Sequence, residues 1–116
     1  MNNNLDELLQ KIKKFRDERD WKQYHNHKDM AISIVLEASE LLEHFQWKNK
    51  EQINDHIIKE KEKIEEEIAD ILIYLLEMAD NLNINILEAA EKKLEKNAKK
   101  YPVEKAKGSA AKYTEL

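Results

Sequence analysis

Two pairs of acidic residues stand within the most apolar stretches of the sequence. Glu37 and Glu40 lie in EASELLEHFQW, and Glu67 and Asp70 lie in EEEIADILIYLLEMAD. At about 100° per residue, a helix places acids three positions apart about 60° from each other, here on one flank of each apolar face. If the two helices pack together, four carboxylates meet at the edge of the core, where desolvation and repulsion are costly without a counter-charge. The pattern therefore predicts a site for a divalent cation.

The types of the side chains favour magnesium over other metals. Magnesium prefers oxygen ligands and keeps several waters or substrate phosphates, whereas zinc favours His and Cys. His25 and His27 have no third zinc ligand at a suitable spacing, and neither Glu37 nor Glu67 begins the Glu-x-x-His motif of di-iron bundles. Mg²⁺ is thus the predicted cofactor, and the implied chemistry acts on phosphates. The alternative is a helical interaction module in which lysines such as Lys63 neutralise the acids.

The composition indicates one all-α domain. The chain has 116 residues, 41% of them hydrophobic, and contains one Gly and one Pro, too few for the tight turns of a sheet protein. A net charge of −4, with acids and lysines interspersed, provides no basic stripe for a nucleic-acid polymer. The sequence lacks cysteine and any apolar run of about 18 residues, so we expect a cytoplasmic protein without a membrane partner.

Helical periodicity predicts four helices. They are expected at about 4–19, at 29–46 with Asp29 as N-cap, at 53–81, and from a cap at Asn83 or Asn85 to just before Pro102. Short connections, including the polar link KNKEQ, favour an antiparallel four-helix bundle completed by oligomerisation. Residues 1–102 would form the catalytic domain and 103–116 a C-terminal tail. Residues expected in the core stripes include Ile12, Phe15, Val35, Leu42, Phe45, Ile64, Ile68 and Leu75.

The acidic pairs resemble the hallmark of the MazG-like, all-α nucleoside triphosphate pyrophosphohydrolases. These proteins carry E-x-x-E on one helix and E-x-x-D on the next long helix, which here are Glu37 to Glu40 and Glu67 to Asp70. Within that superfamily the chain is most similar to the dCTP pyrophosphatases. The stretches that carry this second likeness are ERDWKQYH at 18–25, ELLEHFQWK at 40–48, DILIYLLEMA at 70–79, NAKKYP at 97–102 and KYTEL at 112–116.

The resemblance implies hydrolysis of a nucleoside triphosphate to the monophosphate and pyrophosphate, with dCTP and its modified forms as preferred substrates and nucleotide-pool sanitation as the role. It implies that Glu37, Glu40, Glu67 and Asp70 are catalytic residues that bind magnesium. One carboxylate not fully engaged by metal would orient or deprotonate the attacking water. It also implies a homodimer or homotetramer. A broad-specificity triphosphate pyrophosphohydrolase remains the alternative enzyme.

The resemblance further implies a base pocket built from aromatic rings and a separate set of phosphate and sugar contacts. The residues that match the family's substrate contacts are Trp21, Lys22, Gln23, Tyr24, His25, Trp47 and Tyr74 for the base, and Lys93 and Asn97 for phosphate and sugar. One position departs from the pattern: Ile12 stands where some dCTP pyrophosphatases have a substrate-contacting histidine.

Overall fold

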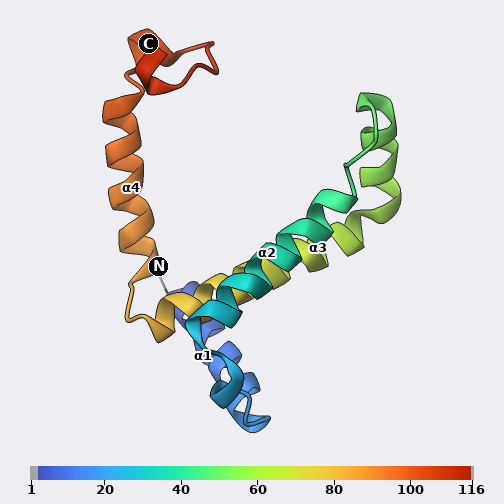
Figure 1. The fold of residues 1–116 in the computed structure, drawn as a ribbon, viewed down its shortest axis with the longest axis vertical. Coiled ribbons are helices and arrows are strands. Elements are labelled where there is room, and N and C mark those ends of the chain that lie inside the picture. The colour runs from blue at the N-terminus through green and yellow to red at the C-terminus, as the bar shows by residue number, and fades with distance from the viewer. Residues whose placement is uncertain (1–2, 116) are drawn as a thin grey trace. The chain divides into compact units, whose positions relative to one another are not determined.

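The computed structural model describes residues 3–115, which form helices and turns without a strand in that range. The elements, in chain order, are α1 (Asn3–Glu18), η1 (Lys22–Tyr24), α2 (His27–Glu43), α3 (Lys50–Asn81), α4 (Ile86–Lys100), α5 (Val103–Ala106) and η2 (Tyr113–Glu115), as Figure 1 shows. The predicted all-α class and the four predicted helices are confirmed. The fourth helix ends before Pro102, as expected from the geometry that a proline imposes on the residue before it.

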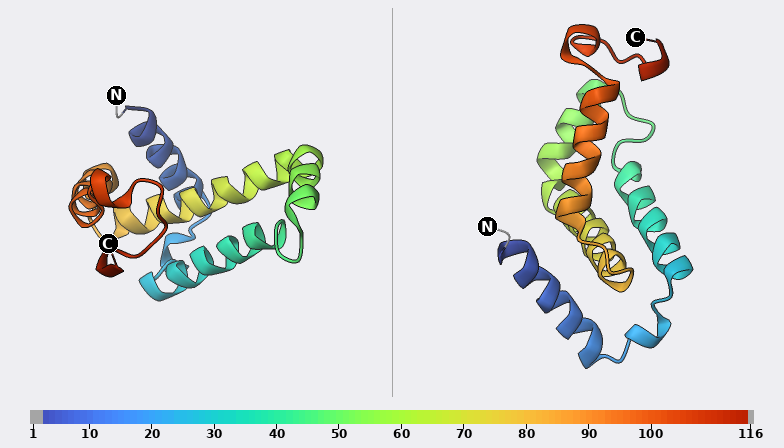
Figure 2. Two further views of the ribbon diagram at one scale, coloured as in Figure 1. Left: turned by 90° about the horizontal axis from the view of Figure 1, so that it is seen from above. Right: turned by 90° about the vertical axis from the view of Figure 1, so that its left-hand side faces the viewer.

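The chain divides after Asn83 into two compact units. In the first unit α2 packs along α3, its antiparallel neighbour in the chain, and α1 packs against α3 as well, as Figure 2 shows. The second unit contains α4, α5 and η2. The predicted boundary at residue 102 between a catalytic domain and a tail, and the predicted oligomer, stay predictions.

Asparagine side chains set the starts of three helices. The side chain of Asn26 accepts from Asp29 N at the start of α2, so the predicted cap at Asp29 is wrong by three residues. Asn49 and Gln52 form a reciprocal capping box, with distances of 2.9 Å in both directions, so α3 begins inside the stretch predicted as a polar link. Asn85, rather than Asn83, caps α4.

The long helix α3 is not continuous. Glu60 departs from helical geometry, with φ −117° and ψ 24°, so α3 consists of two helical segments joined by a kink. The first segment carries His56, and the second carries Glu67 and Asp70. The connection from α2 to α3 is short, and Trp47 within it has a positive φ of 70°. The kink and this connection place the start of α3 beside the end of α2.

The core of the first unit is small and includes two charged residues. Its buried apolar residues are Ile12, Met30, Ile64, Leu76 and Ala79, and Arg16 and Glu77 are buried with them. Much of the expected core stripe is exposed, including Val35 (63%), Leu42 (54%) and Ile68 (52%). Because α2 and α3 bury only one side of broad apolar faces, the other side of each face stays uncovered within this unit.

Candidate functional site

The packing of α2 against α3 brings the four predicted acids together. Glu37 and Glu40 come from α2, and Glu67 and Asp70 come from α3. Burial raises the pKa of Glu37 above its ordinary value of 4.5, and the charges of Glu40, Asp70 and Glu67 raise it further. A hydrogen bond with the Glu40 side chain acts in the same direction. The four carboxylates therefore form one electrostatic cluster, as the spacing predicted.

Two oxygens of this cluster lack hydrogen-bond partners. Glu37 Oε2 and Glu67 Oε2 are buried, and neither accepts a hydrogen bond from the described part of the chain. Buried polar atoms are normally satisfied, so a pair of orphaned carboxylate oxygens fits a cation that would bind there. Among the described residues, no three His, Asp or Glu side chains already stand as a complete ligand set. The metal-binding role of the acids stays a prediction.

The lysine named in the alternative interpretation does not pair with the acidic cluster. Lys63 Nζ lies 3.7 Å from Glu60 Oε2, one turn earlier on α3. The group that contacts the cluster is instead His44, whose Nε2 lies 2.6 Å from Glu67 Oε2. These two atoms are at ion-pair distance but are not aligned as a hydrogen bond, which leaves Glu67 Oε2 among the orphaned oxygens.

His44 also contacts a second histidine. Its Nδ1 lies 2.6 Å from His56 Nε2, and the ring centroids are 4.9 Å apart. Desolvation lowers the pKa of His56, and the positive charges of Lys48 and His44 lower it further. His56, His44 and Glu67 thus form a chain of contacts that ends at the acidic cluster. Sequence reasoning did not assign the two histidines to the site, although His44 lies seven residues after Glu37 on the same helix face.

A cavity of about 390 Å³ adjoins the acidic cluster within the first unit. Three of the predicted base-pocket residues, Trp21, His25 and Tyr74, line it together with Asp70 of the cluster. Burial raises the pKa of Tyr74, and the carboxylates Glu37, Asp70 and Glu77 raise it further. The remaining lining residues are Lys11, Ile12, Phe15, Arg16, Ile73 and Glu77.

The other predicted base-pocket residues do not line this cavity. Gln23 donates to the backbone and carboxylate oxygens of Asp20, at 3.0 Å each. Tyr24 is 66% exposed, Trp47 is 91% exposed, and Lys22 is exposed at the start of η1. Their proposed contacts with substrate stay predictions, as do those of Lys93 and Asn97, which lie on α4 in the second unit.

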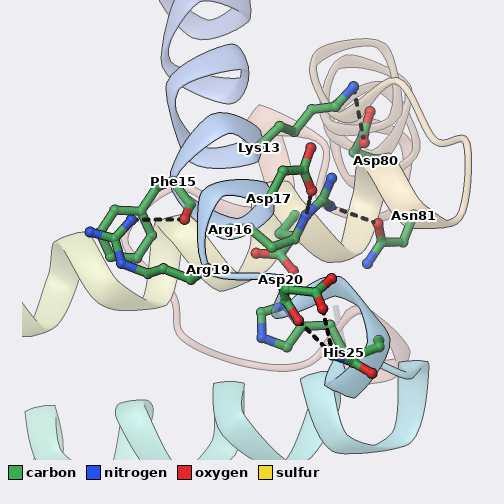
Figure 3. A network of polar contacts seen from close by, with 11 residues as sticks. Lys13, Phe15, Arg16, Asp17, Arg19, Asp20, His25, Asp80 and Asn81 are labelled. Carbon is green, nitrogen blue, oxygen red and sulfur yellow. Dashed lines mark hydrogen bonds and ion pairs between the residues drawn. The ribbon is translucent and has the colours of Figure 1, made fainter.

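Arg16 and Glu77 are the buried charges that sequence reasoning missed. Arg16 is 3% exposed; its Nε donates to Asp17 Oδ1 at 2.9 Å, and its Nη1 reaches Asn81 Oδ1 at 3.5 Å. Figure 3 shows Arg16 between these two partners, with Lys13 and Asp80 beside them. The network ties α1 to the end of α3 and so fixes one wall of the cavity. Glu77, also 3% exposed, forms a hydrogen bond with His25 Nδ1.

The chain belongs to the MazG-like family, whose sequence model matches residues 32–116. It is 35% identical over 97% of its length to dCTP pyrophosphatase 1 of Rattus norvegicus, and covers 67% of that protein. It is 36% identical to dCTP pyrophosphatase 1 of Bos taurus, covering 97% of this chain and 68% of that protein.

A solved structure shares the fold. The crystal structure of a pyrophosphatase from Archaeoglobus fulgidus is 46% identical in sequence and superposes with a TM-score of 0.82, over 85% of this chain and 93% of that one. The predicted MazG-like fold is confirmed, as is the predicted class of enzyme, a nucleoside triphosphate pyrophosphohydrolase. Among the described residues, no helix is long and apolar enough to cross a membrane.

Proposed function

We propose that this chain catalyses magnesium-dependent hydrolysis of dNTPs, preferentially dCTP and modified dCTP, to the monophosphate and pyrophosphate. Its role would be the sanitation of the cytoplasmic nucleotide pool. The observation that carries the proposal is the cluster of Glu37, Glu40, Glu67 and Asp70 beside a ring-lined cavity. The relatives named dCTP pyrophosphatase 1 support the choice of nucleotide.

The cluster fits magnesium by the chemistry of its donors. All four side chains offer carboxylate oxygens, and two of those oxygens are buried without a hydrogen-bond partner. Glu37, Glu40, Glu67 and Asp70 would hold the ion. When bound, the ion would neutralise phosphate charge and acidify water.

The protein's own groups position the reactants and handle the proton. A carboxylate of the cluster that is not engaged by metal orients the attacking water and accepts its proton. Tyr74 stands one turn after Asp70 on α3, and both line the cavity, so a nucleotide whose base lies against Tyr74 brings its phosphates toward the acids. Phosphoryl transfer needs little covalent participation by the protein, so this positioning is its main contribution.

The base lies among the rings of Trp21 and Tyr74, with His25 beside it. Stacking of a base on an aromatic ring contributes about 1–3 kcal/mol and tolerates any base. Selectivity must therefore come from polar groups at the base edge. Lys22, Gln23, Tyr24 and Trp47 complete the proposed base contacts, and Lys93 and Asn97 the contacts with phosphate and sugar.

A broad-specificity triphosphate pyrophosphohydrolase is the second candidate, and one observation favours it. The cavity wall carries Ile12, which is 7% exposed, where some dCTP pyrophosphatases have a histidine that contacts substrate. An isoleucine cannot form a hydrogen bond with a base edge, so this wall would discriminate less.

We further propose that the active form is a homodimer or homotetramer. The apolar residues Ile32, Val35, Leu36 and Leu42 of α2 are 46%, 63%, 59% and 54% exposed. An uncovered apolar face of this kind is typical of a surface that packs against another protein. Light scattering of the purified protein measures the mass directly, and a monomer at assay concentrations would contradict the proposal.

Product analysis by ion-exchange chromatography tests the reaction. The purified protein is incubated with each of the four dNTPs, 5-methyl-dCTP and CTP, with magnesium or with EDTA. Monophosphate and pyrophosphate formed only with magnesium, fastest from cytosine deoxynucleotides, support the leading proposal. Similar rates on all nucleotides favour the broad-specificity candidate, and no turnover by folded protein contradicts both.

A further inference from the structure

Glu77 is a buried acid that the proposed reaction does not use. It lies on α3, three residues after Tyr74 and seven after Asp70, and all three side chains line the same cavity. Only 3% of Glu77 is exposed. A carboxylate buried to this degree is costly unless it is paired or hydrogen-bonded, so its position in the cavity requires a partner.

The partner is His25, at the end of η1. His25 Nδ1 and Glu77 Oε2 form a hydrogen bond between residues 52 positions apart in the chain. In this bond the ring N–H donates and the carboxylate accepts. The bond engages Oε2 and leaves Oε1 able to accept another hydrogen bond. The histidine therefore orients Glu77 without using its full acceptor capacity.

Charge places Glu77 at the base end of a bound nucleotide. A carboxylate repels phosphate oxygens, and the acidic cluster with its proposed ion includes Asp70, two turns earlier than Glu77 on α3. The rings of Trp21 and Tyr74 line the cavity with Glu77. A base held by these rings presents its edge, not its charged tail, to the Glu77 carboxylate.

We propose that Glu77 is the specificity-determining residue that reads the exocyclic amine of cytosine. Cytosine presents the N4 amino group as a donor, and a carboxylate is the acceptor that matches it. Uracil and thymine present the O4 oxygen at the same place, which a carboxylate repels. The 5-methyl group of modified dCTP leaves N4 unchanged, so Glu77 serves both forms. This inference rests on the proposed function, because it assigns the base that the same site selects.

The test compares kcat/KM for dCTP and dUTP in the wild type and in Glu77→Gln. The two substrates differ at the 4-substituent of the base, and the variant keeps the size of the side chain while removing its charge. We expect the preference for dCTP over dUTP to fall by about tenfold or more in the variant. Glu62→Gln, on the exposed part of α3, is the matched control and keeps the preference. An unchanged ratio in Glu77→Gln overturns the proposal.

Binding of the product nucleotides separates this inference from the proposed reaction. Calorimetry with dCMP and dUMP requires no turnover, so it can be read even if the wild type hydrolyses no dNTP. Tighter binding of dCMP by the wild type, lost in Glu77→Gln, supports the role of Glu77 whatever the reaction is. Equal binding of dCMP and dUMP by the wild type overturns it. If the variant does not fold, the test compares kcat/KM of the wild type for N4,N4-dimethyl-dCTP and for 5-methyl-dCTP. We expect a lower value for the N4,N4-dimethyl substrate, which lacks the N4 hydrogens. Equal values for the two substrates overturn the proposal.

Discussion

His44 Nε2 lies 2.6 Å from Glu67 Oε2, and the opposite ring nitrogen of His44 lies 2.6 Å from His56 Nε2. A ring held on one side by a second histidine has a defined orientation, and it restricts the carboxylate on its other side. Glu67 is the only one of the four acids for which the described residues provide an ion-pair partner. His44 is thus placed to position a carboxylate of the cluster.

We predict that His44→Ala weakens magnesium binding by roughly 10-fold, the lower end of the effect seen when a group that orients a metal ligand is removed. Magnesium affinity is measured by isothermal titration calorimetry, and enzyme activity provides a second readout. His27→Ala changes an exposed histidine on the same helix and is the control. Equal magnesium affinity in His44→Ala and the wild type would show that Glu67 needs no such support.

The raised pKa of Glu37 predicts that the stability of the metal-free protein depends on pH. Because its pKa in the folded state is raised above 4.5, the folded protein binds more protons than the unfolded chain between the two pKa values. Stability from this group therefore falls as the pH rises through that range. In EDTA, the Tm of Glu37→Gln should be higher than that of the wild type at pH 7–8. The difference in Tm, which is the gap between the two proteins, should shrink toward pH 4.5. A gap that does not vary with pH would contradict the linkage.

Magnesium should stabilise the folded protein if the acids share one ion. At about 100 times its Kd, a ligand that binds only the folded state adds about 2.7 kcal/mol to the free energy of unfolding. We expect a higher Tm with magnesium in the wild type and a much smaller rise in Asp70→Asn. The metal-free Tm of Asp70→Asn should equal or exceed that of the wild type, since the substitution relieves repulsion. An equal response to magnesium in both proteins would remove Asp70 from the metal site.

Asn49→Ala should destabilise the protein by about 1 kcal/mol, the usual effect of removing an N-cap. Asn49 accepts from Gln52 N and its own N–H donates to Gln52 Oε1, so the substitution breaks one of the two bonds of the capping box. Denaturant unfolding measures the loss. Asn54→Ala, within the following turn, is a control that leaves the cap intact. Equal losses in the two variants would mean that the capping box does not stabilise α3.

The acidic cluster and the helices were predictable because both follow from local spacing. Acids three residues apart on two apolar helices must share a flank, and Asn85 and Pro102 bound the fourth helix by local geometry alone. Periodicity also predicted broad apolar stripes, but it does not say which side of a stripe the same chain covers. Val35 and Ile68 are exposed because the packing of α2 on α3 uses the other side.

The buried charges were not predictable in the same way. Hydrophobic periodicity assigns charged residues to the surface. The burial of Glu77 depends instead on a hydrogen bond with His25, 52 residues away in the chain. One local signal was present: Glu77 lies on the same flank of its helix as Tyr74 and Asp70. The capping box at Asn49 was missed for a different reason, since a polar stretch between two apolar helices was interpreted as a connection.

The kink at Glu60 has a consequence for how the protein opens. The backbone of α3 departs from helical geometry there, so the segment from Lys50 can unfold without disturbing the segment that buries Ile64. Backbone amides before the kink should exchange with deuterium faster than those after it. Such an opening would separate His56 from His44 while the four acids stay on intact helices.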